Sequence, residues 1–193
     1  MTARWRVWQC IRKKPGTDMH LQGEHMVASM IVRDEVPEDI GSIFEVTAKA
    51  FATLDISDKR EPYVIEALRH AGALSLSLVA VFDGRVIGHV AFSPVAVSDG
   101  TEGWFGLGPL SVHPAYPRRG VGTALVREGL ARLQSLGAAG CCLVGHPTYY
   151  VRFGFMNAPG LNVEGVPPEY FFAMPFKGEV PKGVVTFHEA FEV

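Results

Sequence analysis

The sequence predicts a single α/β domain built on one mixed sheet, and three observations carry this prediction. The length of 193 residues suits one folded domain. A hydrophobic content of 48% with 20% charged residues is ordinary for a globular protein. Segments with strand-like alternation are interspersed with segments of helical period, in the order β α α β β β α β α β β.

The first half of the chain supplies a strand, two helices and a hairpin. Residues 30–36 alternate as a strand does. Helices are expected at 37–51 and 61–72, because each segment has a proline and acidic residues near its start. Residues 75–97 predict a β-hairpin, since Asp83 and Gly84 separate two strand-like runs.

The second half continues with an irregular strand at 104–114, which Gly106, Gly108 and Pro109 interrupt. A helix with one broad apolar face follows from residue 121 and stops at Gly137. Residues 139–146 form a short apolar strand, and 147–155 form a short helix or turn. The tail adds one or two strands, within 169–176 and 183–193.

Composition argues against several functional classes. A net charge of −2, with no basic stripe after residue 30, disfavours nucleic-acid binding. The longest apolar run, at 73–82, is about half the ~20 residues of a membrane span, so no membrane association is expected. The three cysteines form no C-x-x-C pair or disulfide framework, which favours the cytoplasm. The seven histidines show no metal-binding spacing, so no metal is expected.

The first 29 residues differ from the rest of the chain. They hold five basic residues against two acidic ones, and they lack the apolar core of a secretory signal. We expect residues 1–29 to be a flexible N-terminal arm or an extra leader, with an organelle transit peptide as the alternative. The folded domain is then expected at 30–193.

The helix after Gly120 is entered through a Gly-x-Gly turn that follows Arg118 and Arg119. The first N–H groups of a helix have no intrahelical acceptor, and the helix dipole is positive there. Glycines keep side chains away, so a phosphate can approach the backbone. The alternative is a surface turn whose glycines serve tight packing. The spacing matches neither the dinucleotide fingerprint nor the ATP phosphate loop.

Two motifs resemble those of the GCN5-related N-acetyltransferases. The stretch "LSVHPAYPRRGVGTALV", at 110–126, is similar to the family's central motif, in which L-x-V-x-P precedes Q/R-x-x-G-x-G/A and a helix. The stretch "YYVRFGF" resembles the second signature, with Tyr150 five residues before Phe155 of a Gly-Phe pair. The form "GHPTYYVRFGF" looks like that of a little-characterised bacterial branch of predicted acetyltransferases. The resemblance implies the family's single-domain α/β fold over 30–193, with a mixed, mostly antiparallel central sheet and helices on both faces.

The resemblance also implies acetyl-CoA as co-substrate. The acceptor would be an amine on a small molecule or protein, attacking directly in a ternary complex. Tyr150 is the implied catalytic general acid, because a phenol pKa of about 10 suits proton transfer to a thiolate. Pro117 departs from the motif's Q/R and lacks an N–H, for which the arginine side chains are expected to compensate. The residues expected to bind the co-substrate are Leu110, Ser111, Val112, Arg118, Arg119, Gly120, Val121, Gly122 and Thr123.

Several points stay open at this stage. The base that deprotonates the amine is one of four side chains or a water chain, the side chains being His89, Glu102, His113 and His146. Cys141 and Cys142 are expected in the core rather than as nucleophiles. A non-catalytic acyl-CoA-binding module is the alternative function, and the presence of Tyr150 disfavours it. A homodimer is also expected, through exposed tail strands.

Overall fold

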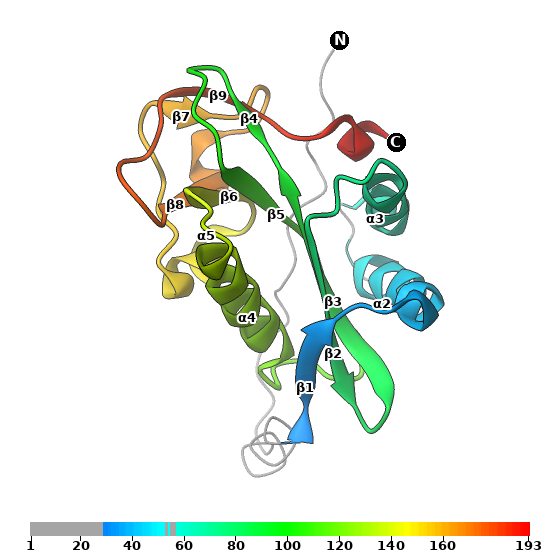
Figure 1. Cartoon of the computed structure of the whole chain (residues 1–193). Helices are drawn as coiled ribbons and strands as arrows, with labels where there is room; N and C mark the ends of the chain where they lie inside the picture. Colours follow the sequence, from blue (N-terminus) through cyan, green and yellow to red (C-terminus); the bar gives the residue numbers. More distant parts are fainter. Residues whose placement is uncertain (1–28, 53, 55–56) are drawn as a thin grey trace.

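The computed structural model describes residues 29–52, 54 and 57–193, and Figure 1 shows their arrangement around a central sheet. The predicted arm at 1–29 lies almost wholly outside the described residues and stays a prediction. The helices are α2 (Ile40–Ala52), α3 (Glu61–His70), α4 (Val121–Ser135) and α5 (Pro147–Tyr150), with 3₁₀ turns η1 (Pro37–Asp39), η2 (Val151–Phe153), η3 (Pro168–Tyr170) and η4 (Glu189–Glu192). Among the helices of this part of the chain, none combines the length and apolarity that crossing a bilayer requires.

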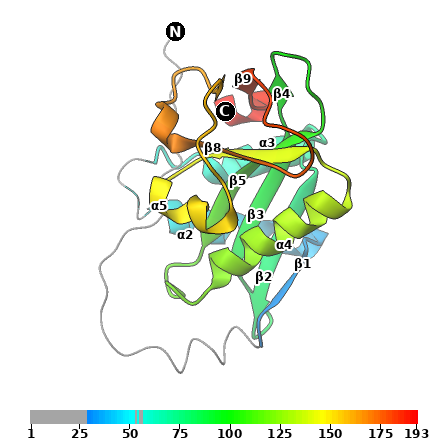
Figure 2. The same cartoon turned by 90° about the vertical axis from the view of Figure 1, so that its left-hand side faces the viewer.

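The main sheet has six strands in the order β1-β2-β3-β5-β6-β8. Its β5–β6 pairing is parallel and its other pairings are antiparallel. Helices α2 and α3 cover one face, and α4 and α5 cover the other (Figures 1 and 2). The expected mixed, mostly antiparallel sheet is therefore confirmed. The strands are β1 (Ile31–Asp34), β2 (Leu76–Phe82), β3 (Arg85–Pro94), β5 (Trp104–Val112), β6 (Gly140–Val144) and β8 (Phe171–Pro175).

A second, three-stranded sheet joins the tail to the middle of the chain. Its order is β4-β9-β7, with β4 (Ala96–Val97), β7 (Leu161–Asn162) and β9 (Gly183–Thr186). The two outer strands have only two residues each: β4 lies at the end of the run 75–97 that predicts a hairpin, whereas the sequence does not predict β7. Since β9 is paired on both sides within this chain, a dimer through its edges has no support here. The homodimer itself stays a prediction.

Helix α4 packs closely on the sheet, which fixes the position of its first turn. A Cβ added to Gly88 of β3 would lie 2.8 Å from Val121 Cγ1. A Cβ added to Gly129 of α4 would lie 2.3 Å from two ring atoms of Phe92. The absence of side chains at these two positions lets helix and strand approach each other. The start of α4 is therefore held against the sheet near the end of β5.

Gly129→Ala should lower the free energy of unfolding by about 1–3 kcal/mol, because the added methyl overlaps the Phe92 ring. The matched control is Gly41→Ala in α2, where nothing lies within 4 Å of the added Cβ. That change should raise the free energy by about 0.5–1 kcal/mol, as alanine favours helix over glycine. Urea denaturation measures both, and equal stability of the two variants would contradict this packing.

Candidate active site

Strands β5 and β6 pair over only three residues each and then part. Residues Trp104–Gly106 pair with Gly140–Cys142. From Leu107 to Val112, β5 pairs with β3 on one side and with no strand of the described chain on the other. Pro109 lacks an N–H, and the β3–β5 register shifts between Val90 and Phe92, as the predicted irregular strand requires. An open strand edge of this kind can hydrogen-bond an extended ligand that carries amide groups.

The turn before α4 ends at a backbone cradle beside this open edge. Gly120 has φ +77°, in the left-handed region that glycine favours. The Ala124 N–H donates to the Gly120 carbonyl at 2.9 Å, which begins the helical hydrogen bonds of α4. The N–H groups before Ala124 therefore point outward from the helix start. The Val121 side chain is buried, so this residue offers the cradle only its backbone.

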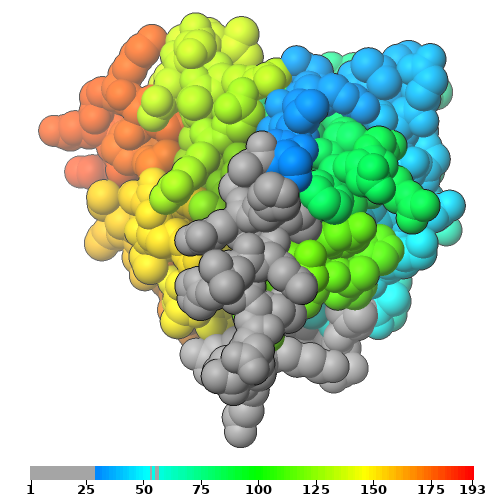
Figure 3. All heavy atoms as spheres, turned by 90° about the horizontal axis from the view of Figure 1, so that it is seen from below, coloured from blue at the N-terminus to red at the C-terminus, as the bar shows by residue number. Residues whose placement is uncertain are grey.

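Both predicted arginines lie at this turn. Arg118 is exposed and has φ +57°, whereas Arg119 is half-buried. The Arg119 guanidinium carbon lies 5.8 Å from the centre of the Tyr116 ring, which in turn contacts Phe82 edge-on. The contact joins the turn to the β2–β3 hairpin, and these segments lie side by side in Figure 3. Two guanidinium groups thus accompany the helix N-terminus, as an anion site requires.

Tyr150 lies on α5, which follows the end of β6. His146 caps this short helix, because its Nδ1 accepts the Thr148 N–H. The Tyr150 ring is buried against Phe155, and a Cβ on Gly145 would lie 2.3 Å from its Cε2 atom. The cradle therefore follows the end of β5, and Tyr150 lies on the short helix that follows the end of β6. Figure 2 shows α4 and α5 on the same side of the sheet.

Gly122 also has a packing role within the protein. A Cβ added there would lie 2.8 Å from the Tyr149 hydroxyl oxygen and 3.5 Å from Val112 Cγ2. The hydroxyl of Tyr149 therefore fills the space beside Gly122. No local pattern in the sequence indicates this place of Tyr149 beside the cradle, since the contact joins two separate helices.

The strand residues of the predicted site offer backbone rather than side chains. The Leu110 side chain belongs to the main core. The Ser111 side chain is fully buried, and its Oγ lies 3.0 Å from Thr47 Oγ1 of α2. These residues can therefore bind an extended ligand only through the open edge of β5.

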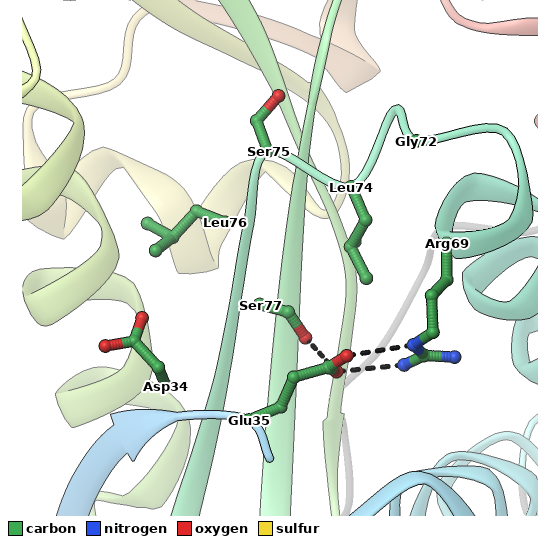
Figure 4. A pocket seen from close by; sticks show the side chains of 8 residues that line it. All are labelled: Asp34, Glu35, Arg69, Gly72, Leu74, Ser75, Leu76 and Ser77. Carbon is green, nitrogen blue, oxygen red and sulfur yellow. Dashed lines mark hydrogen bonds and ion pairs between the residues drawn. The ribbon is translucent and has the colours of Figure 1, made fainter. Parts of the chain in front are cut away.

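His89 is not a suitable base. Its ring is fully buried, and Nε2 lies 2.7 Å from Ser77 Oγ. Ser77 donates to Glu35, whose carboxylate accepts two hydrogen bonds from Arg69 at 2.8 and 2.9 Å (Figure 4). Burial lowers the pKa of His89 to about 4, so the ring is a neutral core residue at pH 7.

A cavity of about 270 Å³ lies beside this buried network, at the β1–β2 edge of the sheet. It is separated from the cradle by two strands, so it is not part of the candidate site. Its lining residues are Asp34, Glu35, Arg69, Gly72, Leu74, Ser75, Leu76 and Ser77.

The other three base candidates lie in turns. Nδ1 of His113 accepts the Ala115 N–H at 3.2 Å, and Nδ1 of His146 caps α5. Glu102 is exposed in the loop before β5, at the opposite end of that strand from the cradle. Of these, the two histidines lie nearest in the chain to the ends of β5 and β6, so they are the better candidates.

Cys141 and Cys142 are fully buried in β6, and burial raises the pKa of both thiols. Their predicted place in the core is confirmed. Within the described part of the chain, no three His, Cys, Asp or Glu side chains come close enough to hold a metal ion together.

A sheet that parts between two parallel strands, with an anion cradle on one side and a tyrosine on the other, defines an α/β protein suited to an extended, phosphate-bearing ligand. The sequence matches the model of the acetyltransferase (GNAT) family over residues 42–155. The chain belongs to this family, the GCN5-related N-acetyltransferases.

Similar proteins support the assignment. YhbS of Escherichia coli K12, named an uncharacterized N-acetyltransferase, is 39% identical over 127 residues, which are 65% of this chain and 73% of YhbS. A GNAT acetyltransferase of Brucella melitensis, crystallised with acetyl-CoA, is 46% identical with a TM-score of 0.76, covering 84% of this chain and 97% of that one. The crystal structure of YhbS with CoA has a TM-score of 0.77 at 35% identity, covering 86% of this chain and 93% of YhbS.

The buried state of His89 predicts a measurable pH dependence. Three charged groups act on its ring: Glu35 and Asp39 raise the pKa and Arg69 lowers it, but burial outweighs them. Because the folded pKa of about 4 lies below the ordinary 6.5, the unfolded chain binds this proton more tightly. The His89 contribution to the free energy of unfolding should therefore fall as pH decreases from 6.5 to 4.

Nitrogen NMR of the imidazole rings measures this directly. We expect the His89 resonances to stay those of a neutral ring down to about pH 5. The exposed His70 serves as the comparison within the same sample. A His89 ring that titrates near 6.5 would contradict its assignment as a neutral core residue.

Proposed function

We propose that this protein is an acetyl-CoA-dependent N-acetyltransferase that acetylates an amine of a small molecule or protein by direct attack in a ternary complex. The observation that carries the proposal is the edge of β5 beyond Gly106, which pairs with no strand of the described chain and leads to the first turn of α4, while β6 leads to α5 and Tyr150. The acetyl-CoA and CoA complexes of the Brucella and Escherichia relatives support the same ligand here.

The described residues fit the parts of this ligand. Backbone N–H groups from Arg119 to Thr123 suit the diphosphate, and the two arginine side chains add charge-assisted hydrogen bonds. Pro117 supplies no N–H to this set. The pantetheine arm carries amides, so it can pair with the open β5 edge from Leu110 to Val112.

Acetyl-CoA supplies a thioester whose carbonyl carbon is attacked by the neutral amine. In the proposed reaction, a backbone N–H near Leu110 or Ser111 stabilises the oxyanion that develops. As the C–N bond forms and the C–S bond breaks, Tyr150 donates its phenolic proton to the CoA thiolate. The amine nitrogen loses its proton to His113, His146 or water, and Tyr150 regains one from solvent.

A non-catalytic acyl-CoA-binding module is the second candidate, because the binding groups alone would serve it. Isothermal titration with acetyl-CoA, followed by a free-thiol assay across polyamines, amino acids, aminoglycosides and a lysine peptide, separates the two. Binding with thiol release supports the enzyme, whereas binding without thiol release in the presence of any of these amines supports the module.

We also propose a cytoplasmic location, from the cysteine pattern, and a homodimer.

Replacing both Arg118 and Arg119 with alanine should weaken acetyl-CoA binding by about tenfold or more at low salt, as each charged contact contributes roughly 1 kcal/mol. The difference should shrink as salt rises, because exposed charges are screened. Arg127→Ala, on the exposed side of α4, is the control for the loss of one positive charge away from the turn. Calorimetric titration at two salt concentrations measures this, and an unchanged dissociation constant would contradict the role of the cradle.

Tyr150→Phe should keep acetyl-CoA affinity and lower kcat by roughly 100-fold, the usual effect of losing one general acid. The ring and its packing against Phe155 remain, so only the phenolic hydroxyl is removed. Thiol release under saturating acetyl-CoA measures kcat, and Tyr170→Phe in η3 controls for loss of a hydroxyl. An unchanged kcat in the Tyr150 variant would remove this residue from the mechanism.

A further inference from the structure

Helices α4 and α5 touch at one point beside the cradle. The Tyr149 hydroxyl oxygen occupies the space next to Gly122, 2.8 Å from where a Cβ would stand. Distances under 3.0 Å between a Cβ and another heavy atom are essentially never seen in proteins, so a side chain at 122 must displace this tyrosine. The packing of α5 against the first turn of α4 therefore requires glycine at position 122.

Tyr149 itself is held on several sides. Its ring is buried, and the Arg152 guanidinium carbon lies 4.6 Å from the ring centre. Arg152 Nε also donates to the Tyr149 carbonyl at 2.9 Å. The Phe153 ring contacts it edge-on, with centres 5.5 Å apart. Because Tyr149 is packed in this way, a displacement of its ring by a side chain at position 122 also displaces the rest of α5.

Tyr150 is the next residue and is in direct contact with Tyr149. The two ring centres are 4.9 Å apart and the rings are nearly perpendicular, at 89°. On its other side the Tyr150 ring lies over Gly145, which has no room for a side chain. The Tyr150 phenol is therefore placed between β6 and Tyr149, and a shift of Tyr149 must move it.

We propose that Tyr149 is a positioning residue: its contact with Gly122 sets the place of the Tyr150 phenol relative to the cradle in α4. The proposal rests on the proposed acetyltransferase function and deepens it. Tyr149 acts through Tyr150, so its influence falls on kcat rather than on acetyl-CoA affinity. Glycine at position 122 then mainly aligns the Tyr150 phenol with acetyl-CoA. Access of the ligand to the backbone is its lesser role.

Two single variants and their combination test this link. Gly122→Ala should lower kcat by about tenfold or more, because a shift of 1 Å in a reacting group is costly. Tyr149→Phe should lower kcat by less than about threefold, since the ring stays in place and only the hydroxyl goes. The double variant removes the clashing oxygen and should recover kcat to about the level of Tyr149→Phe. In Tyr149→Phe and in the double variant, the acetyl-CoA dissociation constant should stay within about threefold of the unaltered protein.

The amine in these assays is the one with the highest rate in the panel above. Gly129→Ala is the matched control, since it also introduces a clash in α4, but with Phe92. Adding Tyr149→Phe should not raise the kcat of the Gly129→Ala variant.

The NMR chemical shifts of the Tyr150 amide provide a readout that needs no turnover. They should change in Gly122→Ala and return to their original values in the double variant.

The outcomes separate the two proposals. A double variant that stays as slow as Gly122→Ala, or Tyr150 shifts that do not return, would overturn the positioning role. A large loss of acetyl-CoA affinity in Gly122→Ala that Tyr149→Phe does not restore would also overturn it, because the added methyl would then block the ligand. If the unaltered protein releases no CoA thiol with any amine of the panel, the proposed function is contradicted. The NMR shifts of Tyr150 then still test whether position 122 acts on Tyr150 through Tyr149.

Discussion

A parallel ladder of three residue pairs holds β5 and β6 together before they part, and the site depends on where this ladder ends. Because the strands are joined at Gly106 and Cys142, their ends diverge from a common origin. The end of β5 leads to the cradle and α4, while the end of β6 leads to α5 and Tyr150. A longer ladder would satisfy the β5 edge with protein backbone and leave no edge for a ligand. In the proposed function, this divergence leaves the β5 edge available to the co-substrate and separates it from the helix that carries Tyr150.

Features that depend on neighbouring residues in the chain could be predicted from the sequence. The hairpin turns at Asp83 and Gly84 as expected, with β2 ending at Phe82 and β3 beginning at Arg85. Helix α4 begins directly after Gly120, where the Gly-x-Gly pattern places it. These outcomes follow from local backbone preferences and periodicity, which a sequence carries directly.

Features that depend on how distant elements pack could not be predicted in this way. The Ser111 side chain lies against Thr47 of α2, and no local pattern shows that partner. The Tyr149 hydroxyl reaches Gly122 only because α5 packs on the first turn of α4. Strand β7 has only two residues, too few for a visible alternation, and the separation of β4 from β3 follows from its pairing with the distant β9.

The two glycines of the cradle show why the sequence left two interpretations open. Gly120 adopts φ +77°, so its role lies in the backbone turn that exposes the helix N-terminus. Gly122 lies within the helix, and its role is close packing against Tyr149. A special backbone angle and tight packing, which the pattern alone cannot separate, thus apply to different residues of the same motif.

The burial of Cys141 and Cys142 has a consequence for a protein that would generate a new thiol in every catalytic cycle. Thiol–disulfide exchange requires access and a thiolate, and these two side chains have neither, since both are fully buried and their raised pKa keeps them protonated. Released CoA therefore cannot form mixed disulfides with β6 while the protein is folded. Colorimetric thiol reagents will likewise leave this pair unmodified, so that neither residue adds to the signal from the product.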